Sequence, residues 1–178
     1  TSISDGIIKI ELAKLWISKQ FENLKKIFIF NIQVTLYTSI LIILILVFFN
    51  EIIFELWIGK NFIIDQKIFL LLLFSALFQS LFFSSVSLQT STNNFKKITI
   101  YNFLNSIIFI VFLYNLINIQ TNLLIVAVLF LISDLIVFYN ALSLSSKMID
   151  KSISENFLKI FSFINFKNSA TKIIKHYG

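Results

Sequence analysis

The chain has no cysteine and no proline, and it has a single histidine. The absence of cysteine excludes disulfides, cysteine-ligated zinc sites and thiol nucleophiles, and one histidine cannot build a multi-histidine metal site. Arginine is also absent, so all fifteen basic residues are lysines. Charged residues make up 13% of the chain, whereas soluble proteins average about 25%. We therefore expect no cofactor and no ordinary soluble domain.

Most of the sequence consists of long apolar runs. Residues 27–50, 68–95 and 98–133 contain no charged side chain, and the last run continues past Asp134 to residue 146. A polar stretch at 115–122 divides that run into two halves. Each half is long enough to cross a bilayer, because about 20 apolar residues at about 1.5 Å per residue cover about 30 Å of hydrocarbon. The sequence therefore predicts an all-α integral membrane bundle of about four transmembrane helices, over residues 29–49, 68–90, 98–116 and 123–144.

Lysines are concentrated on one side of this topology. Thirteen of the fifteen lie in residues 1–26, in the 93–97 turn or after residue 146. The positive-inside rule then places both termini of this chain in the cytoplasm. The formal charge of +6 favours attraction to an anionic lipid bilayer and not to nucleic acid, because the lysines flank the apolar runs.

Amphipathic segments flank the predicted four-helix bundle, which covers residues 29–145. Residues 1–28 form a cytoplasmic amphipathic segment, in which a helix over 7–28 is expected to lie in the membrane interface. Residues 146–178 form a basic cytoplasmic tail, in which 152–166 favour a second interfacial helix. No linker rich in proline, or in glycine and serine, indicates a second domain.

Three sequence motifs occur one after another along the chain, and their order indicates a family resemblance. Ser2-Ile3-Ser4-Asp5-Gly6 opens the lysine-rich amphipathic stretch, residues 56–62 read Leu-Trp-Ile-Gly-Lys-Asn-Phe after the first span, and residues 88–97 end the second span in small polar residues and a lysine pair. In this order they resemble the C-terminal part of lipid-linked oligosaccharide flippases. These are the O-antigen-type polysaccharide transporters of the multidrug/oligosaccharidyl-lipid/polysaccharide exporter superfamily. The resemblance covers roughly residues 1–145.

The resemblance implies a function in polysaccharide or lipopolysaccharide biosynthesis in the bacterial cytoplasmic (inner) membrane. Family members move a polyprenyl-diphosphate-linked glycan across the membrane by alternating access between two helix bundles. They have more helices than the four predicted here. The resemblance therefore implies that this chain is a C-terminal fragment, whose partner is an N-terminal helix bundle of the same chain.

Four polar residues inside the predicted spans are candidates for substrate binding or coupling: Asp134, Asn102, Asn105 and Gln79. Asp134 is the one ionisable residue inside a span. Since a carboxylate at the bilayer centre costs about 2.5 to 3.5 kcal/mol, it should face protein or water.

Two interpretations of Asp134 stay open. It is either a site that couples transport to protons or cations, or a structural group that pairs with Asn102, Asn105 or Ser133, and the structural interpretation is preferred. Asn102 and Asn105 share one helix face and are either cavity-lining residues or contacts between helices. Gln79 is likewise either a cavity-lining residue or a contact between helices.

Other classes of function have less support. No phosphate-binding loop and no plausible Ser/His/Asp set occurs, so we do not expect an enzyme. The membrane half of a primary exporter would need longer cytoplasmic extensions than the 93–97 turn. The alternative is a non-transporting membrane anchor or assembly subunit of a larger membrane complex, which explains the composition but not the Leu-Trp-Ile-Gly element. An open reading frame upstream of Thr1 that encodes further spans would favour the transporter, and a start codon there would favour the anchor.

Overall fold

The computed structural model describes residues 2–57, 59, 65–117 and 123–149. Within these ranges the chain forms six α-helices and no β-strand, which confirms the predicted all-α fold. The helices are α1 (Ser2–Ile17), α2 (Phe21–Phe48), α3 (Asn50–Trp57), α4 (Gln66–Ser91), α5 (Lys96–Ile117) and α6 (Leu123–Ile149). Four of them, α2, α4, α5 and α6, are long and apolar enough to cross a membrane. The chain is therefore a multi-pass membrane protein.

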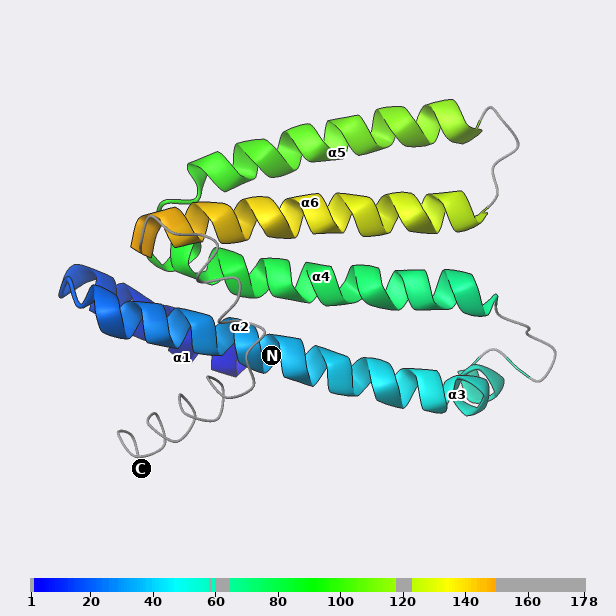
Figure 1. Ribbon diagram of the computed structural model, residues 1–178, viewed down its shortest axis with the longest axis horizontal. Helices are drawn as coiled ribbons and strands as arrows, with labels where there is room; N and C mark the ends of the chain where they lie inside the picture. The colour runs from blue at the N-terminus through cyan, green and yellow to red at the C-terminus, as the bar shows by residue number, and fades with distance from the viewer. Residues whose placement is uncertain (1, 58, 60–64, 118–122, 150–178) are drawn as a thin grey trace.

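The four long helices lie side by side in the order α2, α4, α6, α5 (Figure 1). The last described helix, α6, thus lies between α4 and α5, and α4 and α6 run parallel to each other. Contacts between α4 and α6 are the most extensive, while α5 packs on α6 and on no other described helix to a comparable extent. This order places one face of α6 against α4 and another against α5.

The amphipathic helix expected over 7–28 is not continuous, and that prediction was wrong. The chain reverses direction between Ile17 and Phe21, so that α1 packs alongside α2 (Figure 1). Lys19 adopts a left-handed conformation with φ 56°. Its amide donates to the carbonyl of Trp16 (3.1 Å), and the next amide donates to the carbonyl of Leu15 (3.0 Å). These two bonds form a Schellman C-cap. The usual sequence signal for such a cap is a glycine at the left-handed position, and here that position is a lysine.

This turn folds α1 back against the bundle. α1 contacts both α2 and α4, and it buries Leu12 and Leu15. Residues 21–28, which were assigned to the amphipathic segment, instead form the beginning of α2. The first long helix therefore starts eight residues before the predicted span.

The apolar core is concentrated at one end of the bundle, the end that holds the α1–α2 turn, the α4–α5 turn and the end of α6 (Figure 1). We call it the lysine-rich end, because Lys25, Lys26, Lys96, Lys97 and Lys147 all lie near it. The core cluster consists of Leu12, Leu15, Leu24, Phe28, Ile29, Ile32, Leu36, Leu77, Leu81, Leu88, Phe138 and Leu142.

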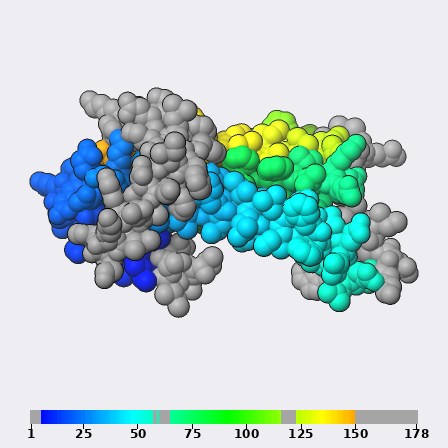
Figure 2. All heavy atoms as spheres, turned by 60° about the horizontal axis from the view of Figure 1, so that its bottom comes forward, coloured from blue at the N-terminus to red at the C-terminus, as the bar shows by residue number. Residues whose placement is uncertain are grey.

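The opposite end of the bundle packs much less closely. After Leu36, no residue of α2 is buried. Figure 2 shows this second half of α2 as a continuous outer surface that leads to α3. The side chains there are mostly large and apolar, as expected for a surface that faces lipid.

Small and polar side chains join α4 to its neighbours at the lysine-rich end. Gln89 donates from Nε2 to the carbonyl of Ala141 (3.1 Å) and to Oγ of Ser145 (2.9 Å), and the Ser145 hydroxyl donates to the carbonyl of Ser85 (2.6 Å). All four residues are buried. Small residues let helix backbones approach closely within a membrane, and hydrogen bonds then add to the packing.

The other side of α4 is bonded to α2 in a similar way. Asn31 donates from Nδ2 to Oγ of Ser87 (3.3 Å), and Thr35 and Ser84 share a hydrogen bond between their hydroxyls. α4 is thus held on both sides by polar contacts at the same end of the bundle.

A second glycine-free Schellman turn ends α4. Asn93 has φ 55°, and its amide donates to the carbonyl of Thr90 (3.3 Å), while the amide of Asn94 donates to the carbonyl of Gln89 (2.8 Å). The turn is short, so α5 begins beside the end of α4.

Several sequence predictions fall partly or wholly outside the described residues. These are the interfacial helix over 152–166, nearly all of the 146–178 tail, and part of the 115–122 loop. Of the segment 56–62, only Leu56, Trp57 and Gly59 are described. Gly59 has φ 110°, a conformation that L side chains rarely adopt and that explains a glycine after α3.

Candidate functional site

A cavity of about 410 Å³ lies between α4, α5 and α6 and is open to the surface; most of its lining surface is apolar, and we call it the polar cavity for the five polar side chains that it contains. Its lining comprises Leu72, Ser75, Ala76 and Gln79 from α4, Ser106, Phe109 and Ile110 from α5, and Phe130, Ser133 and Asp134 from α6. One carboxylate, three hydroxyls and one amide therefore lie together in an open cavity among three apolar helices.

The cavity lies near the middle of the spanning helices. Ser75 is about 14 Å along α4 from Gln66, and Asp134 is about 16 Å along α6 from Leu123, at about 1.5 Å per residue. The hydrocarbon core of a bilayer is about 30 Å thick. Both polar groups thus lie at mid-membrane depth.

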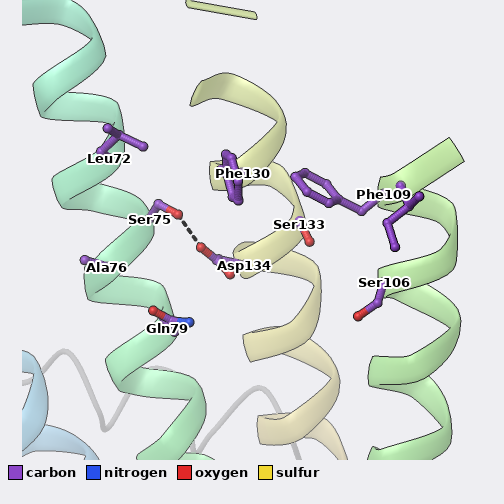
Figure 3. Close-up of a pocket in the computed structure, with 10 residues that line it drawn as sticks. Leu72, Ser75, Ala76, Gln79, Ser106, Phe109, Phe130, Ser133 and Asp134 are labelled. Atoms are coloured by element: carbon purple, nitrogen blue, oxygen red, sulfur yellow. Dashed lines mark hydrogen bonds between the residues drawn. The ribbon is translucent and has the colours of Figure 1, made fainter. Parts of the chain in front are cut away.

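Asp134 pairs with α4. The hydroxyl of Ser75 donates to a carboxylate oxygen of Asp134, and Figure 3 shows the two side chains pointing toward each other across the space between α4 and α6. Ser75 itself is buried, and Asp134 is half-buried. The contact therefore leaves part of the carboxylate accessible from the cavity.

The expected pairing of Asp134 with Asn102, Asn105 or Ser133 was wrong. Asn105 donates from Nδ2 to Oγ of Ser133 at 2.8 Å, so these two residues join α5 to α6 instead. Neighbouring residues on an α-helix point about 100° apart. Because Ser133 faces α5, Asp134 is turned toward α4, where Ser75 meets it.

The four predicted site residues are not all at the cavity. Asp134 and Gln79 line it, and Asn105 bonds to Ser133, which also lines it. Asn102 lies one turn nearer the lysine-rich end and is not part of the lining. Its Oδ1 is buried without a hydrogen-bond partner among the described residues.

Sequence reasoning missed Ser75 and Ser106 as members of this site. A signal was present for Ser75, because it lies four residues before Gln79 and such pairs share one helix face. Ser106 had no comparable signal. Its side chain donates to the carbonyl of Asn102 (2.9 Å) and points from α5 toward α6 (Figure 3).

Aromatic rings close one side of the cavity. Phe109 of α5 and Phe130 of α6 lie with ring centroids 4.8 Å apart, at an interplanar angle of 55°. Among the described residues there is no group of three or more His, Cys, Asp or Glu side chains that could hold a metal ion. The arrangement instead offers oxygen atoms around one carboxylate, which suits a proton or a small cation, and hydroxyl and amide groups, which suit a polar solute.

Comparison with protein-family models, with curated proteins and with solved structures finds no match to this chain.

Proposed function

We propose that this chain is part of a membrane transporter that moves a lipid-linked oligosaccharide or polysaccharide precursor across the bacterial cytoplasmic membrane by alternating access. Two observations support the proposal. One is the ordered set of motifs that resembles O-antigen-type flippases. The other is the polar cavity at mid-membrane depth, and this cavity carries most of the argument.

The cavity favours transport because it presents polar groups where lipid would otherwise lie. Gln79 and Ser106 are exposed on the described surface, and Asp134 lies in the same cavity. A carboxylate at this depth has to face protein or water. Transporters place their substrate and ion sites near the bilayer midplane, at the interface between two structural repeats. A second helix bundle facing α4 and α5 would complete such a site.

The cavity lining also limits what this part of the protein contributes. No lysine lines it, so it lacks a cation to pair with the diphosphate of the substrate. Its hydroxyl and amide groups instead match the hydroxyl-rich glycan. Asp134 is the candidate for proton or cation coupling. By the positive-inside rule, the lysine-rich end faces the cytoplasm.

Thiol accessibility tests the cavity directly, because the protein has no cysteine of its own. Gln79→Cys and Ser106→Cys place single thiols in the cavity. Phe103→Cys and Ile107→Cys are matched controls on exposed apolar positions of α5. A membrane-impermeant maleimide should label the two cavity thiols in intact membranes and leave the two controls unlabelled. If the cavity thiols were unlabelled from both sides of the membrane, a partner helix would fill the site, as the anchor alternative requires.

Deletion of the gene tests the substrate class. Cells without the intact protein should lose their surface polysaccharide and accumulate the lipid-linked precursor on the cytoplasmic face of the membrane. Normal surface polysaccharide in the deletion strain would contradict the proposal, whatever the thiol labelling shows.

A further inference from the structure

A second, smaller cavity of about 210 Å³ lies at the lysine-rich end, where the end of α4, the start of α5 and the end of α6 meet. Gln89, Asn94, Lys97, Leu144, Lys147 and Met148 line it. It is separate from the cavity around Asp134, with which it shares no residue.

Two lysines from different helices flank this cavity. Lys97 is the second residue of α5, and Lys147 lies in the last turn of α6. No acidic residue lines the cavity, and neither lysine forms an ion pair within the part of the chain that the structure describes. The C-terminal ends of α4 and α6 bring partial negative charge and the N-terminal end of α5 brings partial positive charge, which together leave about half a unit of negative charge, less than the two positive charges of the lysines. The two ammonium groups therefore set a positive potential in the cavity.

The rest of the lining is polar on one side and apolar on the other. Gln89 is only 1% exposed, and its hydrogen bonds to Ala141 and Ser145 hold it in place. Leu144 and Met148 supply an apolar wall on the α6 side. The cavity thus combines two cations, amide groups and hydrocarbon in one small volume.

We propose that Lys97 and Lys147 form a binding site for the phosphate headgroup of an anionic phospholipid. Basic pockets between transmembrane helices at the cytoplasmic side bind such headgroups. The cavity lies where two spanning helices reach the edge of the hydrocarbon, which is the depth of lipid phosphates. Leu144 and Met148 offer hydrocarbon contact that free phosphate cannot use, and for this reason a lipid fits better than free phosphate. The proposal does not depend on what the protein transports.

Native mass spectrometry of the full chain in a neutral detergent tests the site. The protein is titrated separately with phosphatidylglycerol and with phosphatidylcholine, and bound lipids are counted. We expect one tightly bound phosphatidylglycerol. Lys97→Gln and Lys147→Gln should each weaken it about fivefold, and the double variant about 25-fold, since each lysine near an anionic surface contributes about that factor.

Lys96→Gln is the matched control. It removes the same charge from the neighbouring position of α5, which does not line the cavity, and it should change binding less than about twofold, because its ammonium group would act on the bound headgroup only through screening water and salt. The lysines of the tail are the same in every variant, so their contribution cancels. Lys97→Arg with Lys147→Arg should retain binding, which separates loss of charge from misfolding.

Three results would overturn the proposal. The first is a loss in Lys96→Gln as large as in Lys97→Gln, which would show diffuse attraction without a site. The second is equal binding of phosphatidylcholine. The third is displacement of the lipid by millimolar inorganic phosphate, which would show an anion site that does not recognise lipid.

Discussion

The two ends of the helix bundle differ in how closely their helices pack. At the lysine-rich end, α4 and α6 meet through Ser85, Ala141 and Ser145, all of them fully buried. At the opposite end, α2 presents exposed residues such as Ile42 and Ile45. The lysine-rich end therefore buries small residues beside the large apolar residues of the core cluster, whereas the second half of α2 leaves its large apolar residues exposed.

This difference follows from the solvent. In water, large apolar side chains drive association because they are removed from water. In lipid, association of large apolar side chains gains little free energy, because lipid tails are as apolar as leucine. Small residues that permit close approach of the helix backbones then become the main source of packing energy. The contact between α4 and α6 at the lysine-rich end contains small residues of this kind, and the following variants test how much they contribute to stability.

The largest effect is expected from Ala141→Leu. The added side chain would force α6 away from α4 and strain the bond that the Ala141 carbonyl accepts from Gln89, which should destabilise the protein by about 1 to 3 kcal/mol. Unfolding in mixed micelles, followed by circular dichroism during a titration with dodecyl sulfate, measures the change.

Ala76→Leu is the matched control for this variant. Ala76 is exposed and lines the polar cavity, so the same enlargement should change stability by less than about 0.5 kcal/mol. Equal losses in the two variants would show that the two ends of the bundle do not differ in packing.

Gln89→Met should have the next largest effect. Methionine has a similar shape but removes both interhelical hydrogen bonds of Gln89. Hydrogen bonds between membrane helices average about 0.6 kcal/mol each, so we expect a loss of about 1 kcal/mol in the same unfolding assay. Gln79→Met, at an exposed position, should stay within about 0.5 kcal/mol of the wild type. A larger loss at Gln79 would mean that the polar cavity carries more of the stability than the α4–α6 contact.

Lys19→Gly should stabilise the protein by about 0.5 to 1 kcal/mol. Lys19 has φ 56°, and a left-handed conformation costs an L residue about 1 to 2 kcal/mol. Glycine avoids this cost, but part of the gain is offset because glycine gives the unfolded chain more conformational entropy. Asn93→Gly should gain less, because asparagine tolerates this conformation better. Lys14→Gly, inside α1, is the control and should cost about 1 kcal/mol. Thermal unfolding in detergent measures all three, and a destabilised Lys19→Gly would show that the α1–α2 turn is not strained.

Asp134→Asn should change stability least, by less than about 0.5 kcal/mol, because an amide oxygen still accepts the hydrogen bond from Ser75. Its effect on transport separates the two interpretations of Asp134. Loss of transport at normal expression would assign it to coupling, and unchanged transport would leave it a structural role. A loss of stability above about 1 kcal/mol would instead show that the charge itself holds α4 and α6 together.

The sequence was a good guide to the number and type of the long helices. Hydropathy and length are properties of each segment alone, and the four long helices of the structure overlap the four predicted spans. Which helices are neighbours was not predicted, since apolar faces that meet lipid and apolar faces that meet protein have the same composition. The position of α6 between α4 and α5 was therefore not accessible from the pattern.

The candidate site was predicted only in part for a related reason. Asp134 and Gln79 were found because polar side chains inside a span are conspicuous. The partner of Asp134 was missed because it depends on the rotation of α6 about its axis, which Ser133 and Asn105 fix by their own bond. The break at residues 18–20 was missed because its Schellman turn has Lys19 in place of glycine. The Schellman turn that ends α4 likewise has Asn93 in place of glycine.

The dependence of α5 on α6 has a consequence for membrane insertion. α5 has the lowest mean hydropathy of the four spans, 1.6, and it leaves the ribosome before α6, the one described helix that packs extensively on it. Until α6 arrives, Asn105 has no Ser133 to bond with, and it meets lipid instead. We therefore expect α5 and α6 to enter the bilayer together as a hairpin. A chain that stops at residue 122, with a glycosylation tag at its new end, should leave α5 only partly inserted, whereas a chain that continues to residue 149 should insert both helices.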